Sequence, residues 1–226
     1  MSTHARPARV VAVTGACGEI GRATARAFAT SRTTLVLMAG QGAGPGEGGD
    51  LVRVADEVCV AGGTAVVLPL DVGDPSAVGA AVDRVESEVG PIDVWVNAPV
   101  SPDGADRSLS ASEYRRLAEI GYLGCVYTTK AVLEPMMARD RGTVVQVSEC
   151  ADCRSAADGP SSTLGAEQAI QSFHGSLVDE LVRRESHVHL AIIEASVQVH
   201  EPDGVARAVV DAAAQALRRG AATDVA

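Results

Sequence analysis

The sequence has little lysine and little tyrosine. Lys130 is its only lysine, and its tyrosines are Tyr114, Tyr122 and Tyr127. Any mechanism that needs a lysine therefore has one candidate. No stretch of about 18 apolar residues is present, which argues against a transmembrane helix. The N-terminal segment carries no long apolar run before its first glycine turn, so we expect no signal peptide.

Positive charge is also scarce, because 19 Lys and Arg residues stand against 29 Asp and Glu residues, a net charge of -10. This balance argues against nucleic acid or an anionic membrane as the main partner. The five cysteines are an odd number and lack the regular spacing of a disulfide framework, so we expect the protein to reside in the reducing cytoplasm. The CxxC at 150–153 has no second CxxC and no obvious histidine partner, and we expect no metal site.

Short β-branched runs alternate with helical patterns of ten or more residues. The runs predict strands at 9–13, 34–39, 64–70, 93–97, 143–147 and 188–193. Helices are predicted at 20–29, 50–61, from Asp74-Pro75 onward, from Ser110 or Ser112 to about 138, at about 162–184, and at 202–217. This alternation predicts an α/β fold, a single doubly wound domain over 1–226 with a mainly parallel sheet. Residues 1–7 are expected to be a flexible N-terminus and 40–50 a mobile glycine-rich loop.

A glycine-rich turn, TGACGEIG at 14–21, joins the first predicted strand to the first predicted helix. Its glycines are Gly15, Gly18 and Gly21. A dinucleotide site needs such glycines for a tight bend, for backbone approach to the pyrophosphate, and for close helix–strand packing. The free N–H groups of the helix N-terminus then face the phosphates. The turn predicts dinucleotide binding, with Cys17 and Ile20 in the same segment; a glycine turn without a ligand is the alternative.

With this turn the chain resembles the short-chain dehydrogenase/reductase family, over about residues 8–217. Asp71-Val72 resembles the family's adenine-contacting Asp-Val, and DVWVNA at 93–98 resembles its DVLVNNAG, which adds Asn97 and Ala98 to the expected cofactor site. GTVVQVS at 142–148 resembles the strand that leads to the catalytic serine, and DGVARAVVDA at 203–212 the C-terminal helix. The resemblance implies a Rossmann-type fold, NAD or NADP as cofactor, and a homodimer or homotetramer.

The family's hydride-transfer residues, Asn, Ser, Tyr and Lys, are all replaced. Their positions fall on Gly121, Glu149, Thr163 and Glu167. Threonine cannot act as a general acid in place of a phenol, because it has no accessible ionised form near neutral pH. A carboxylate at the lysine position would raise a neighbouring phenol's pKa instead of lowering it. Lys130 lies in a helix that the family uses for packing.

The nicotinamide half of the family's site is also altered. Ala195-Ser196 stands where the family has a Pro-Gly that supports the nicotinamide, and the lid that follows residue 196 is only about 197–201. Gly40, after the second predicted strand, offers neither an acid for ribose hydroxyls nor an arginine for a 2′-phosphate. The sequence therefore does not discriminate NAD from NADP.

Glu149 and Glu167, with Ser148 nearby, are the expected catalytic residues. Two carboxylates in one cleft can have their pKa values pushed apart, which suits proton transfer in an isomerisation, dehydration or cyclisation. Solvated surface carboxylates are the alternative. The leading hypothesis is a non-redox enzyme acting on a small organic substrate. A divergent NAD(P)-dependent oxidoreductase using Glu149 or water, and a non-catalytic nucleotide- or partner-binding protein, are the other two.

Overall fold

The computed structural model describes residues 9–40, 50–98, 110–148, 161–195 and 201–223. Within these ranges one six-stranded sheet has the order β3-β2-β1-β4-β5-β6, and every pair of neighbours is parallel. The strands are β1 (Arg9–Thr14), β2 (Thr33–Leu37), β3 (Thr64–Val67), β4 (Ile92–Asn97), β5 (Gly142–Ser148) and β6 (Val188–Glu194). The order reverses between β1 and β4, which confirms the predicted doubly wound Rossmann-type fold.

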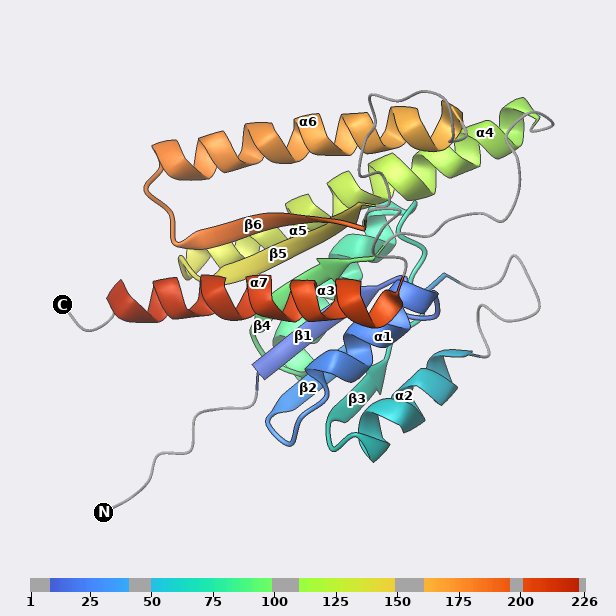
Figure 1. Ribbon diagram of the computed structural model, residues 1–226. Helices are drawn as coiled ribbons and strands as arrows, with labels where there is room; N and C mark the ends of the chain where they lie inside the picture. Colours follow the sequence, from blue (N-terminus) through green and yellow to red (C-terminus); the bar gives the residue numbers. More distant parts are fainter. Residues whose placement is uncertain (1–8, 41–49, 99–109, 149–160, 196–200, 224–226) are drawn as a thin grey trace, which may run out of the picture.

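Helices cover both faces of the sheet (Figure 1). They are α1 (Glu19–Phe28), α2 (Asp50–Val60), α3 (Pro75–Glu88), α4 (Ala111–Ala118), α5 (Gly124–Ala138), α6 (Ser161–Arg183) and α7 (Pro202–Thr223), with a π-helical segment η2 (Glu119–Leu123) joining α4 to α5. One hydrophobic cluster packs α3, α5 and α6 against one face of the sheet, and a second packs α1, α2 and α7 against the other.

Alternation along each strand builds these two clusters. In β1, Val10 and Ala12 belong to the first cluster, whereas Val11 and Val13 belong to the second. Successive side chains of a strand point to opposite faces, so a strand buried on both sides reads as a continuous apolar run. Each fully buried valine contributes about 1.5–3 kcal/mol relative to an exposed one. The central strands therefore anchor the fold and hold the carboxyl edge of the sheet in place.

Two helix starts follow the predicted capping chemistry. The Asp74 side chain accepts hydrogen bonds from the backbone N–H groups of Ser76 and Ala77, with Pro75 in the first turn of α3. Ser110 caps α4 in a capping box with Glu113, in which each side chain bonds the other residue's backbone N–H. These interactions satisfy N–H groups that a helix leaves without intrahelical partners, which is why the caps mark the helix starts in the sequence.

Three elements differ most from their predicted extents, whereas the other strands agree to within two residues at either end. The third strand ends at Val67 instead of residue 70, although the chain stays beside the β2 segment, because the Leu68 and Leu70 N–H groups still donate to the Leu37 and Ala39 carbonyls. The last helix reaches Thr223, six residues beyond the predicted end at Leu217. The helix predicted from Ser110 to about 138 is interrupted by η2, where the Gly124 N–H bonds the Glu119 carbonyl five residues back. A π-helical turn of this kind leaves no hydrophobic signature in the sequence.

Candidate functional site

The glycine-rich turn has the backbone geometry that a phosphate site requires. Gly15 has a φ of 63°, which favours glycine, and the Gly18 N–H donates to its carbonyl at 3.0 Å. A Cβ at Gly21 would collide with the Gly15 carbonyl, so only glycine allows α1 to pack this closely on the turn. Gly18 is the N-cap of α1 and brings no side-chain cap, so the helix presents its first-turn N–H groups at the carboxyl edge of β1. The turn fits a pyrophosphate.

Cys17 and Ile20 are half-buried and pack against the hydrophobic cluster on the α1 side of the sheet. Their apolar contacts hold the turn on the core. A cofactor contact of either residue stays a prediction.

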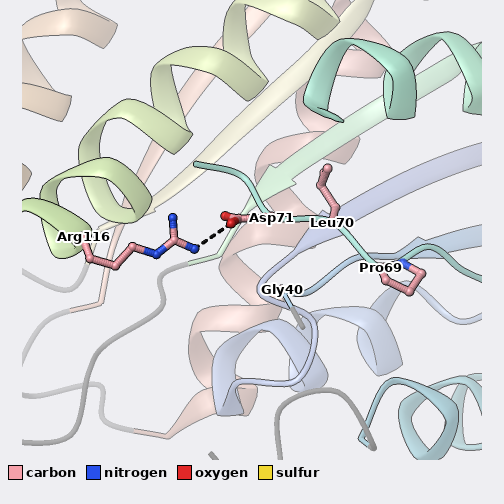
Figure 2. Close-up of a pocket in the computed structure, with 5 residues that line it drawn as sticks. All are labelled: Gly40, Pro69, Leu70, Asp71 and Arg116. Atoms are coloured by element: carbon pink, nitrogen blue, oxygen red, sulfur yellow. Dashed lines mark hydrogen bonds and ion pairs between the residues drawn. The ribbon is translucent and has the colours of Figure 1, made fainter. Parts of the chain in front are cut away.

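A cavity of about 240 Å³ lies beside the carboxyl ends of β2 and β3 (Figure 2). It is lined by Gly40, Pro69, Leu70, Asp71 and Arg116. The volume is somewhat below the roughly 300–1,000 Å³ of pockets that hold a whole small molecule, so this cavity suits part of a ligand. The predicted adenine-contacting residue Asp71 therefore does line a pocket at the expected edge of the sheet.

The Asp71 carboxylate is held from two sides. Arg116 Nη2 donates to Oδ2 at 2.6 Å, and the Gly73 N–H donates to Oδ1 at 2.9 Å. Partial burial acts to raise the pKa of Asp71, but these hydrogen bonds and the arginine charge outweigh it and leave the pKa below its ordinary value. Asp71 is thus an ionised acceptor at neutral pH. Arg116 was not a sequence-predicted site residue.

Val72 fixes the same turn from the other direction. A Cβ at Gly124 would lie 2.7 Å from Val72 Cγ2, so the first residue of α5 must be glycine for the helix to approach this closely. Val72 is half-buried against the first hydrophobic cluster. The Asp71-Val72 turn is therefore positioned by α4 and α5 together.

Asn97, at the end of β4, is buried and serves the fold through its side chain. Its Oδ1 accepts from Trp95 Nε1 at 2.8 Å and Thr128 Oγ1 at 2.9 Å, and its Nδ2 donates to Thr129 Oγ1 at 3.1 Å. These bonds tie β4 to α5. Because the Asn97 side chain is occupied in these bonds and Ala98 is also buried, only the backbone of these two residues is placed to make the predicted cofactor contact.

Ser148 and Glu167 are brought together. Ser148, the last residue of β5, is fully buried, and its Oγ donates to Glu167 Oε2 at 2.6 Å. Glu167 lies on α6 with only 6% of its surface exposed. A hydroxyl bonded to a carboxylate at this distance is a strong, charge-assisted hydrogen bond. Glu167 is therefore not a solvated surface residue. The third predicted catalytic residue, Glu149, lies outside the described residues.

A cluster of buried polar side chains lies next to this pair, between α5, β5 and α6. Cys125 Sγ donates to Gln146 Oε1 at 2.9 Å and lies 3.7 Å from His174 Nε2. Burial, together with the nearby Glu167 carboxylate, raises the pKa of Cys125 to about 12, so it remains a thiol. Burial lowers the pKa of His174 to about 4, so its imidazole is neutral at pH 7. Glu167 and His174 are seven residues apart, which is two turns of α6. This spacing is the sequence signal that both side chains lie on the same face of that helix.

The tyrosines and the lysine do not assemble a hydride-transfer site in the part of the chain that is described. Tyr114 is exposed on α4, Tyr122 and Tyr127 are half-buried, and Lys130 is exposed on α5. Thr163, at the family's tyrosine position, belongs to α6. Gly121, at the asparagine position, lies in η2.

Several predictions fall on residues outside the described ranges. These are the CxxC at 150–153, nearly all of the glycine-rich loop at 40–50, residues 1–7, and nearly all of the segment at 196–201. Among the described residues, no group of three or more His, Cys, Asp and Glu side chains could hold a metal ion. Within the same ranges no helix has the length and hydropathy needed to cross a bilayer.

Comparisons with known proteins agree on one family. Residues 9–196 match the family model described as short chain dehydrogenase. The oxidoreductase UcpA of Escherichia coli is 31% identical over 196 residues, which cover 86% of this chain and 72% of UcpA. The ketoacyl reductase HetN of a Nostoc species is 31% identical over 144 residues, 63% of this chain and 48% of HetN. The chain spans about half the length of HetN and of a fungal short chain dehydrogenase that it also matches.

A solved structure matches the fold. It is a metagenomic short-chain oxidoreductase in complex with NADP, with a TM-score of 0.80 and 24% identity, covering 92% of this chain and 90% of that one. At this identity the likeness establishes the fold.

Proposed function

The chain belongs to the short-chain dehydrogenase/reductase family, and from that premise we propose that it binds a nicotinamide dinucleotide, NAD or NADP, at the carboxyl edge of its sheet. The observation that carries the proposal is the turn from Gly15 to Gly21. It combines the positive φ of Gly15, a Gly21 whose position admits no Cβ, and an α1 N-terminus capped by glycine. Each of these features keeps side chains away from the N-terminus of α1 and leaves space there for a phosphate group. The NADP bound in the structural neighbour supports the same reading.

The described residues account for two parts of the cofactor. The turn and the N-terminus of α1 would hold the pyrophosphate, and the cavity beside Asp71 would hold the adenine. When bound, the nicotinamide would be able to supply or accept a hydride, which only the second candidate reaction below would use. On the protein side, the buried hydrogen bonds of Asn97 keep the end of β4 in place beneath the cofactor edge.

For the reaction, we propose proton transfer on a small organic substrate at the end of β5. The supporting observation is the buried bond between Ser148 and Glu167, where the family has its lysine. A carboxylate with little exposure can hold a proton and return it, and the Ser148 hydroxyl connects it to the strand end. Glu149 follows directly in the chain and is the proposed group that meets substrate. Glu167 then acts through Ser148 as a positioning residue.

A redox reaction is the second candidate, and the relatives favour it. UcpA is named an oxidoreductase and HetN a ketoacyl reductase. In this reading Glu149 or a bound water replaces the family's tyrosine as proton donor. The two candidates differ in whether the cofactor is consumed, and that difference can be measured directly.

Binding is tested first, by titrating the protein with NADH and NADPH and following the nicotinamide fluorescence. Saturable binding of NADH or NADPH is the expected result. If the protein binds neither of them, the proposal is refuted. Turnover is then tested on a metabolite panel by mass spectrometry. A product isomeric with its substrate, or one that has lost water, supports proton transfer. A product changed by two hydrogens, with equal loss or gain of NAD(P)H, supports the redox candidate instead.

Two variants localise the chemistry. Glu149→Gln should abolish turnover, and Glu167→Gln should lower kcat and shift its pH profile, because the amide keeps the shape but cannot ionise. Glu134→Gln, an exposed glutamate on α5, is the matched control and should leave turnover unchanged. Full activity of the Glu149→Gln, Glu167→Gln double variant would exclude the two-carboxylate mechanism.

A further inference from the structure

We propose that Glu194, together with Glu167, makes the protein bind the oxidised, positively charged form of the dinucleotide in preference to the reduced form. Glu194 is the specificity-determining residue. It is the last residue of β6 and was not among the sequence-predicted site residues. The inference rests on the proposed dinucleotide binding and deepens it, because it concerns the charge of the ring that the site accepts.

The register of the sheet puts Glu194 beside Ser148. These two residues end β6 and β5 and are register partners, and the Ala195 N–H donates to the Ser148 carbonyl at 2.7 Å. Figure 1 shows the two strands side by side. Leu190, four residues before Glu194, packs in the first hydrophobic cluster, so side-chain alternation directs Glu194 to the α6 side of the sheet. Ser148 lies on the same side, because its Oγ bonds Glu167 of α6.

The two glutamates reach this edge from different surroundings. Glu167 is 6% exposed and accepts the hydroxyl proton of Ser148 in the charge-assisted bond described above. Glu194 is exposed, and it takes part in none of the ion pairs formed among the described residues. A ligand that arrives at the ends of β5 and β6 therefore meets negative side chains from a strand end and from a helix.

The topology of the sheet directs the nicotinamide half of a bound dinucleotide to this edge. A dinucleotide lies across the point where the strand order reverses, here between β1 and β4, with one half on either side. The proposed function gives the side of β2 and β3 to the adenine. The nicotinamide then lies on the side of β4, β5 and β6, where Glu194 ends one strand and Glu167 is bonded to the end of another.

Charge distinguishes the two forms of the cofactor at this edge. The oxidised nicotinamide ring carries a unit positive charge, and the reduced ring carries none. Opposite charges attract over several ångströms at a partly exposed site, where screening is weaker than in bulk water. We expect a preference of about tenfold for the oxidised form. Because a tenfold change corresponds to about 30 mV for a two-electron couple, the midpoint potential of the bound cofactor should fall by that amount.

The test is calorimetric titration of the full chain with NADP+ and NADPH and, in parallel, with NAD+ and NADH. The wild-type protein should bind the oxidised member of a pair about tenfold more tightly than the reduced member. Glu194→Gln, a substitution at an exposed position, should reduce this preference to about threefold, and adding Glu167→Gln should remove it. Glu134→Gln is the matched control, because it removes one exposed negative charge from α5 and should keep the preference.

ADP-ribose, which lacks the nicotinamide ring, locates the effect. Its affinity should be the same for the wild type and for Glu194→Gln. Equal binding of both forms, tighter binding of the reduced form, or a Glu194→Gln variant with the full preference would overturn the inference, as would a matching loss of ADP-ribose affinity. These outcomes leave the proposed dinucleotide binding intact, whereas a protein that binds none of the four dinucleotides refutes both.

Discussion

Burial of His174 makes the stability of the fold depend on pH in a calculable way. The imidazole has no exposed surface, and its Nδ1 has no hydrogen-bond partner among the described residues. Burial therefore lowers the pKa of His174 from 6.5 to about 4. The unfolded chain takes up a proton near pH 6.5 that the folded chain does not accept. Stability is complete above pH 6.5 and is lost as the pH falls below it.

The size of the loss follows from the two pKa values. At pH 5 the unfolded imidazole is almost fully protonated, whereas about a tenth of the folded population is. The free energy of unfolding should fall by about 2 kcal/mol between pH 8 and pH 5, and by about 3 kcal/mol once the pH is below 4. The carboxylates with lowered pKa values, such as Asp71 and Asp140, lose their stabilisation mainly below pH 4.5. The interval from pH 8 to pH 5 thus separates the effect of His174 from that of these carboxylates, and the comparison with a His174 variant separates it from the other histidines.

The assay is urea denaturation at pH 8, 7, 6 and 5 of the wild-type protein and of His174→Gln. Glutamine keeps a polar group near Cys125 but does not titrate, so the variant should lack about 2 kcal/mol of the wild-type pH dependence. Phe173→Leu is the control, because it removes the ring that packs edge-on against His174 without changing any titratable group. It should lower stability equally at every pH. Parallel pH curves for the wild type and His174→Gln would refute a neutral, buried imidazole.

Two further predictions concern backbone and capping positions. Gly21→Ala should abolish nucleotide binding and lower the melting temperature, because the added Cβ would collide with the backbone carbonyl of Gly15. Gly79→Ala should instead raise the free energy of unfolding by about 0.5–1 kcal/mol, because a Cβ at that helical position meets nothing within 4 Å. A Gly21→Ala variant that binds NADPH normally would contradict the assigned turn. Ser110→Ala breaks the capping box with Glu113 and should cost about 1 kcal/mol in urea denaturation, with unchanged stability as the opposing result.

The elements that sequence patterns predicted well are those whose signals are local. Val10 to Val13 form an apolar run because both faces of β1 are buried, and the cap at Asp74 and the glycines of the first turn act within a few residues. Each such signal involves neighbours in the chain, so the pattern and the structure report the same interaction. The resemblance to a family predicts Asp71 as an adenine-contacting residue, and the structure places it at the wall of a cavity.

The parts that could not be predicted depend on contacts between distant segments. Arg116 donates a hydrogen bond to Asp71, 45 residues away in the sequence, and Cys125 donates one to Gln146, 21 residues away. No periodic pattern in the sequence predicts either contact. The pairing of Ser148 with Glu167 was anticipated only as nearness, and the hydrogen bond with its depth of burial came from the structure. The role of Glu149 stays a prediction.

The π-helical segment η2 sets the rotational phase of α4 relative to α5. In an α-helix each residue turns the chain by about 100°, so one surplus residue rotates everything before it by that angle. Deleting one residue from 119–123 would let α4 and α5 merge into a regular helix. The cap at Ser110 would survive, but Arg116 would swing by about 100° away from Asp71. A single-residue deletion would then break the bond between Arg116 and Asp71 at the wall of the cavity while every residue of that cavity is kept, which makes the number of residues in η2 as decisive here as side-chain identity.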